Sequence, residues 1–169
     1  ALPRAEQVDD LWRRARESFG AAAVRDGGML AWRYAPARGA MYEAINVRSR
    51  SGVLEAIAIV RRPSESGDSR LRGIRVASLS DLLFSATAVQ AGVAVIAAAE
   101  RAARRMGADA LLCSAAHASI VDALKRRAFL KLPGNVHLMV RDPQRASGVS
   151  TELQTWWVTR GDAQSDESF

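Results

Sequence analysis

Apolar residues recur every three to four positions over residues 5–19, a spacing that predicts an amphipathic helix with Gly20 at its end. On its polar face, Asp9–Arg13 and Asp10–Arg14 form favourable i,i+4 pairs. A short helix or turn is expected over residues 28–35. Residues 41–47 and 53–61 predict two strands joined by a hairpin turn at residues 49–52. A polar loop over residues 63–69 then leads into a long strand over residues 71–84.

The second half of the chain predicts a strand–helix–strand unit. Residues 87–106 carry an apolar stripe at helical spacing, and Gly107 is expected to end that helix. Residues 110–113 are wholly apolar, which is typical of a strand at the centre of a sheet. A helix over residues 120–128 with Ser119 as N-cap, and strands over residues 136–140 and 155–159, complete the chain. Such a unit implies a right-handed parallel crossover, which leaves a ligand crevice at the carboxyl end of its first strand.

This order of elements predicts an α/β fold. Antiparallel strands come first, a parallel strand–helix–strand crossover follows, and helices cover both faces of a mixed, twisted sheet. A chain of 169 residues fits one domain, expected over residues 1–160, with a polar tail over residues 161–169. Because the chain does not begin with Met, we also expect it to be a processed or excised piece, such as a C-terminal domain, of a longer protein.

The composition is that of an ordinary globular protein, with 49% hydrophobic and 25% charged residues. Its single cysteine, Cys113, excludes an intramolecular disulfide, and the two histidines and this cysteine show no metal-binding spacing. The N-terminal residues lack the apolar core of a signal peptide, and the longest uncharged run is too short and too rich in Ala to span a bilayer. We therefore expect a cytoplasmic protein with no membrane span.

The net charge of +6 comes almost entirely from arginine, since only Lys125 and Lys131 are lysines. The basic residues are scattered through different elements, and no run of five or more occurs. This pattern indicates either a diffuse basic surface or a groove for an anionic ligand such as a nucleotide cofactor. It argues against a nucleic-acid-binding domain, whose affinity would fall steeply with salt.

Three local patterns resemble the GNAT superfamily of CoA-dependent acyltransferases. LAWRY, followed by a Pro and then Tyr42, is similar to a WRY…P…Y pattern in a bacterial GNAT-like subgroup. ERAARRMGADALLC is similar to a helix-to-strand junction common across the superfamily, and WWVTRGDAQSD to the W.LT.GDSD ending of the same subgroup. The resemblance covers about residues 5–160. The subgroup often occurs beside genes for polysaccharide or cell-envelope biosynthesis, and often as one half of a tandem GNAT pair. The first strand and helix of a full GNAT domain are not evident.

The resemblance implies that acetyl-CoA places its pyrophosphate on the N-terminus of the long helix, which suits anion binding. The nearest match to the Gly-rich family loop is the run of residues 90–94, one residue short, where Gly92 equally well permits close helix–sheet packing. Ser85 or Thr87 is expected to cap the helix, and the backbone of residues 82–87 to bind pantetheine and pyrophosphate. The implied cofactor-binding residues are Leu82, Leu83, Phe84, Ser85, Ala86, Thr87, Gln90 and Gly92.

The resemblance also implies a carboxylate base on the long strand, and Asp81 is the candidate, acting directly or through water. The alternative is an Asp satisfied by the backbone or by an Arg at a strand end. His117, after the second parallel strand, is a second candidate base or a capping residue. The Tyr that serves as acid in the family corresponds to Leu124, which cannot donate a proton.

Two functions follow from these observations. The first is acetyl transfer from acetyl-CoA to an amine, with an amino sugar of an envelope polysaccharide as the expected acceptor. The second is a degenerate, non-catalytic GNAT module with a structural or protein-interaction role in a larger protein. A homodimer or a tandem-domain partner is compatible with either function.

Overall fold

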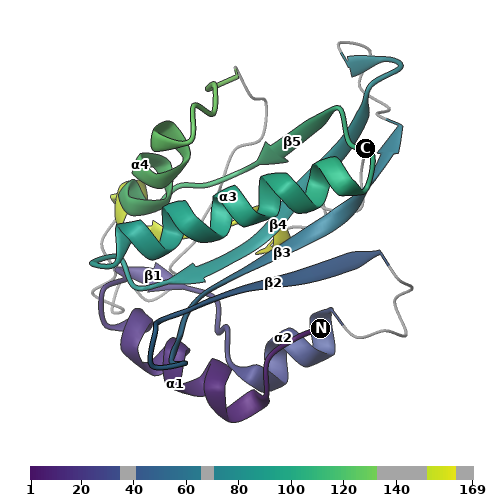
Figure 1. Cartoon of the computed structure of the whole chain (residues 1–169). Coiled ribbons are helices and arrows are strands. Elements are labelled where there is room, and N and C mark those ends of the chain that lie inside the picture. The colour runs from purple at the N-terminus through teal and green to yellow at the C-terminus, as the bar shows by residue number, and fades with distance from the viewer. Residues whose placement is uncertain (35–40, 66–70, 133–151, 163–169) are drawn as a thin grey trace.

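The computed structural model describes residues 1–34, 41–65, 71–132 and 152–162 of the chain. At its centre lies a four-stranded twisted sheet in the order β2-β3-β4-β5 (Figure 1). The strands are β2 (Tyr42–Arg48), β3 (Leu54–Glu65), β4 (Arg75–Phe84) and β5 (Ala110–Cys113). The pairs β2–β3 and β3–β4 are antiparallel, and β4–β5 is parallel. The predicted switch from antiparallel hairpins to a parallel crossover is therefore confirmed.

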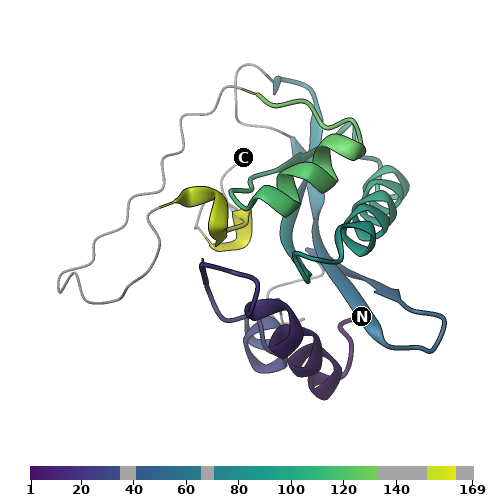
Figure 2. The same cartoon turned by 90° about the vertical axis from the view of Figure 1, so that its left-hand side faces the viewer.

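Helices cover both faces of this sheet (Figures 1 and 2). The helices are α1 (Ala5–Arg16), α2 (Gly27–Arg33), α3 (Val89–Arg105) and α4 (Ala118–Arg126). Side chains alternate along β3, so that Ile57 and Ile59 pack under α1 and α2, while Ala58 and Val60 face α3. The small Ala residues on the α3 side let this long helix lie close to the sheet.

The C-terminal part of the described chain returns to the centre of the molecule. A 3-10 helix η3 (Leu153–Thr155) leads into β6 (Trp156–Trp157), and a further 3-10 helix η4 (Arg160–Asp162) follows. Strand β6 pairs in parallel with β1 (Ala21–Ala22), the short strand between α1 and α2. Two short strands near opposite ends of the sequence therefore lie side by side, although most of the chain separates them.

Two details near the N-terminus differ from the prediction. Helix α1 ends at Arg16, so Gly20 lies beyond it and does not end it. An added Cβ on Gly20 would collide with the Thr155 side chain. Gly20 thus permits close approach of the C-terminal segment. Asp10 on α1 pairs with Arg13 and Arg14, whereas Asp9 accepts a hydrogen bond from the Gly27 amide and links α1 to α2.

The apolar strand over residues 110–113 is present, but it lies at the edge of the described four-stranded sheet and its residues are only partly buried. Its expected central position is therefore wrong for the described part of the chain. The predicted strand over residues 155–159 is reduced to β6 and one isolated bridge between Thr159 and Ala115. The predicted strand over residues 136–140 lies outside the described residues.

Candidate functional site

Strand β4 separates from β5 halfway along its length. The parallel pairing ends at Leu79, opposite Cys113. On the other side of β4, Asp81 pairs with Ile59 and Leu79 with Val60, which leaves Ser80 as the extra residue of a β-bulge. Bulges bend a strand and re-aim its side chains, and they are frequent beside active sites. The carboxyl end of β4 continues beyond its last pairing with β5, at the place where the sequence predicts a ligand crevice.

The C-terminal segment, residues 156–162, lies along β4 beyond the end of β5. The indole N–H of Trp157 donates a hydrogen bond to the Leu82 carbonyl over 2.8 Å. A Cβ on Gly161 would lie 2.8 Å from the Ser80 carbonyl oxygen, so only glycine allows this approach. Part of the β4 backbone that was expected to bind pantetheine is therefore occupied by the chain's own side chain.

The turn between β4 and α3 is held from two sides. The Ala86 amide donates to the Ser18 hydroxyl, and the Ala86 carbonyl accepts from the Ser119 hydroxyl. Ser85 and Thr87 bond to each other, so neither side chain caps α3, contrary to expectation. Instead Ala88 occupies the N-cap position without a side-chain bond. The N-terminus of α3 thus carries backbone amides without a side-chain cap, which is the arrangement that binds anions.

The remaining candidate cofactor residues divide into two groups. Leu82, Leu83 and Phe84 are buried in the two cores, and a Cβ on Gly92 would lie 2.6 Å from the Phe84 ring. Gly92 therefore serves the close helix–sheet packing that the sequence left open as an alternative to a phosphate loop. Thr87 and Gln90, by contrast, are exposed at the start of α3.

Asp81 lies on the face of β4 that α2 covers, and its side chain is almost fully buried. Its Oδ1 accepts from Nε of Arg25 at 2.8 Å and from the Thr159 hydroxyl at 3.1 Å. Its Oδ2 accepts from the Tyr34 hydroxyl at 3.1 Å. Both oxygens are therefore engaged by side chains from three different parts of the chain. The role of Asp81 as a base stays a prediction, and this geometry matches the alternative of an Asp satisfied by an Arg.

Arg25 is the centre of this buried group, with no exposed surface. Its guanidinium forms ion pairs with Asp81 and with Asp162, and it also donates to the Ala23 carbonyl. Burial alone lowers the pKa of Arg25, but the charges and hydrogen bonds of the two carboxylates outweigh it and leave the pKa raised. One cation and two carboxylates leave one excess negative charge. Arg25 has no distinguishing sequence signal among the many Arg residues of the chain.

His117 begins α4 and acts as its N-cap, in place of the predicted Ser119. Its Nδ1 accepts a hydrogen bond from the Ser119 amide at 3.1 Å. The imidazole packs edge-on against Phe19 and lies close to Trp157. Burial lowers its pKa, and a hydrogen bond with the Ser18 backbone acts in the opposite direction. These contacts give His117 a capping role, and its role as a base stays a prediction.

The lowered pKa of His117 predicts a stability that decreases in mild acid. The unfolded chain binds a proton at this residue more readily than the folded chain, so the contribution is fully present above the ordinary pKa of 6.5. It is lost as the pH falls through the lower pKa of the folded state. We expect the urea midpoint to fall between about pH 8 and about pH 5.5, and to fall less in His117→Asn, which keeps a capping side chain. An equal fall in both proteins would contradict this assignment.

Two further residues give no catalytic group. Burial raises the pKa of the Cys113 thiol to about 12, so this thiol stays protonated and behaves as a small hydrophobe. Leu124, which the sequence resemblance aligns with the Tyr acid of GNAT enzymes, packs against the main core. Among the described residues, no helix is long and apolar enough to cross a membrane.

Comparison with known proteins supports the fold. No family model and no curated protein matches this sequence. Among solved structures, a probable acetyltransferase matches with a TM-score of 0.58 and 17% identity, over 84% of this chain and 95% of its own. An acetyltransferase from Trypanosoma brucei matches with a TM-score of 0.56 and 13% identity, over 83% of this chain and 97% of its own. An aminoglycoside 6'-N-acetyltransferase from Acinetobacter haemolyticus has a TM-score of 0.54 and 14% identity, with coverages of 83% and 97%. The predicted GNAT-like fold is confirmed.

Proposed function

We propose that this chain is an acyltransferase domain that transfers an acetyl group from acetyl-CoA to an amine. One observation carries the proposal: β4 continues past the Ser80 bulge and beyond its last pairing with β5, and it leads into the N-terminus of α3, which has no side-chain cap. This is the arrangement in which a helix N-terminus accepts a pyrophosphate. A solved neighbour with the same fold, at a TM-score of 0.51 and 15% identity, is an aminoglycoside N-acetyltransferase in complex with CoA.

The proposed reaction is a direct transfer. The amine nitrogen attacks the thioester carbonyl carbon, the new C–N bond forms, and the C–S bond breaks. The amine proton passes to water or to a base, and the CoA sulfur leaves as a thiolate that water protonates. Within this chain, the backbone amides of Val89 and Gln90 would hold the pyrophosphate, because the Ala88 amide already donates to the Ser85 carbonyl. Asp81 keeps the C-terminal segment against β4 through Arg25 and Thr159. An amino sugar is the proposed acceptor.

The experiment is calorimetric titration with acetyl-CoA, with desulfo-CoA as a comparison. We expect micromolar binding by the chain, and binding weakened by about tenfold in Gln90→Glu, whose added charge lies in the first turn of α3. Gln7→Glu makes the same change of charge on α1 and is expected to leave binding unaltered. Weakening by both variants alike would place the pyrophosphate elsewhere.

The second candidate is a non-catalytic module, and a specific observation favours it. Asp81 forms a buried ion pair with Arg25, and the Trp157 indole N–H donates a hydrogen bond to the Leu82 carbonyl. Both features engage groups at the carboxyl end of β4 with the chain's own side chains. Absence of acetyl-CoA binding up to millimolar concentration, with the fold intact, would favour this candidate over acetyl transfer.

A further inference from the structure

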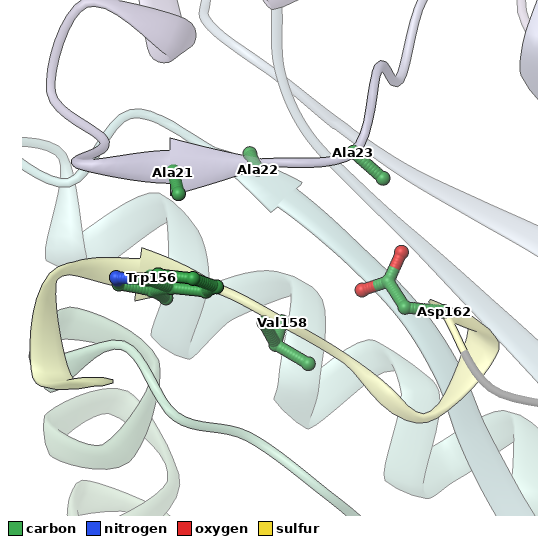
Figure 3. Close-up of a pocket in the computed structure, with 6 residues that line it drawn as sticks. All are labelled: Ala21, Ala22, Ala23, Trp156, Val158 and Asp162. Carbon is green, nitrogen blue, oxygen red and sulfur yellow. The ribbon is translucent and has the colours of Figure 1, made fainter. Parts of the chain in front are cut away.

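A small hollow lies at the surface between β1 and β6 (Figure 3). Its volume is about 250 Å³, and it is lined by Ala21, Ala22, Ala23, Trp156, Val158 and Asp162. All but one of these residues are apolar, and the exception is a carboxylate. An apolar surface with one well-placed polar group is the usual composition of a small-molecule site.

The register of the two strands determines which side chains face this hollow. Ala21 lies opposite Trp156, and Ala22 lies opposite Trp157. Side chains alternate along a strand, so Trp157 points into the core while its neighbours Trp156 and Val158 point outward. Figure 3 shows the Trp156 indole and the Val158 side chain on one side of the hollow, with the Asp162 carboxylate at one end.

Arg25, Asp81 and Asp162 form a buried charge cluster, and the Asp162 carboxylate is its most exposed member. Its Oδ2 is bonded to Arg25 and to the Thr159 amide, whereas the structure records no partner for its Oδ1 among the described residues. The side chain is 21% exposed, and those of Arg25 and Asp81 are 0% and 4% exposed. The excess negative charge of the cluster is therefore accessible to solvent only at Asp162.

We propose that this hollow binds the ammonium group of a primary amine, with the ammonium on Asp162 and the body of the ligand against Trp156. A charge-assisted hydrogen bond to Oδ1 would neutralise the excess charge. The indole supplies a surface for cation–π and apolar contact, and a partly buried charge is less screened by salt. The role of the hollow as an acceptor site rests on the proposed acetyl transfer, but binding itself does not.

The size of the hollow limits the ligand. A volume of about 250 Å³ lies below the range of ordinary ligand pockets, about 300 to 1,000 Å³, so it suits one small ring or a short chain. A hexosamine and a cyclic alkylamine both present a primary ammonium on a compact body. The two ligand classes, amino sugars and cyclic alkylamines, share the ammonium group. Titration with one probe of each class distinguishes between them.

The test is titration of the full chain by calorimetry in the absence of acetyl-CoA. The probes are glucosamine against glucose, and cyclohexylamine against cyclohexanol, so that each pair differs mainly in the ammonium group. We expect the amine of at least one pair to bind about tenfold or more tightly than its neutral partner. Binding by glucosamine alone assigns the site to amino sugars, and binding by cyclohexylamine alone assigns it to alkylamines. Equal binding of amine and neutral partner in both pairs overturns the proposal.

Variants locate the site. Asp162→Asn keeps the shape and removes the charge, and we expect it to weaken amine binding by about tenfold. Asp122→Asn, on exposed α4, is the matched control and is expected to bind as the parent does. Ala23→Leu fills the hollow without changing a charge, and we expect it to weaken amine binding. This variant tests the location of the site if Asp162→Asn does not fold. Unaltered binding in Ala23→Leu would overturn the location.

The outcomes separate this inference from the proposed function. Amine binding that depends on Asp162, together with no binding of acetyl-CoA, would retain the site and reject acetyl transfer. Acetyl-CoA binding, together with amine binding that is unchanged in Asp162→Asn, would retain acetyl transfer and reject the amine site at Asp162.

Discussion

Arg25→Met is expected to lower the free energy of unfolding by about 3–5 kcal/mol, because it leaves the buried Asp81 carboxylate without its cation. Met has a similar length and no charge, so the loss reflects mainly the uncompensated carboxylate. Urea unfolding monitored by circular dichroism measures the effect, with the slope of the transition compared between variants to check that the unfolded reference is the same.

Two further variants test whether the loss comes from the unpaired buried charge. Arg126→Met removes an exposed i,i+4 pair with Asp122 and is expected to cost less than about 1 kcal/mol. The double variant Arg25→Met/Asp81→Asn removes both charges of the buried pair, and we expect it to be more stable than Arg25→Met alone. A loss in Arg25→Met no larger than that in Arg126→Met would show that the buried cluster is not what anchors the C-terminal segment.

Trp157→Ala is expected to cost about 3–5 kcal/mol, as for other fully buried aromatic residues. The indole stacks on Phe19 with ring centroids 4.1 Å apart and meets Phe84 edge-on at 4.9 Å. Its removal would leave a cavity lined by Phe19, Phe84 and His117. Thermal or urea unfolding measures the loss.

Trp157→Phe separates the ring from its polar contact. It retains much of the aromatic packing but leaves the Leu82 carbonyl without its N–H donor, which is expected to cost about 1–3 kcal/mol. The control is Trp32→Phe on α2, since Trp32 is 65% exposed and such a change is expected to stay within about 0.5 kcal/mol. Equal stability of Trp157→Phe and the parent would mean that the hydrogen bond to Leu82 contributes nothing.

These two residues connect stability to function. Arg25 and Trp157 hold residues 156–162 against the carboxyl end of β4, which is where the acetyl-CoA site is proposed. A domain that binds acetyl-CoA must therefore accommodate the cofactor beside this segment. A non-catalytic domain gains from it a filled and stable crevice.

Local patterns in the sequence are sufficient for most of the fold. The alternation in β3 and the apolar stripe of α3 follow from backbone geometry. Every second residue of a strand, and every third or fourth residue of a helix, lies on the same face. Gly107 ends α3 with a positive φ of 77°, as its type predicts. The resemblance, to which residues 100–113 contribute, linked this order of elements to the GNAT-like fold, and the solved structures support that fold.

The candidate site is different, because its contacts join residues that are far apart in the chain. Arg25 lies 56 residues from Asp81 and 137 from Asp162, and no spacing or composition marks these residues as partners. For His117 the sequence left a base and a capping residue as alternatives, and the structure shows it capping α4. For Gly92 it left a phosphate loop and close packing as alternatives, and the structure places it against the Phe84 ring because α3 packs closely on β4. The sequence by itself determined the elements and the fold class, since these depend on short-range periodicity. Only the tertiary structure decided that Asp81 is paired with Arg25, that Trp157 bonds to the Leu82 carbonyl and that Asp162 is partly exposed, because these outcomes depend on which distant side chains burial brings together.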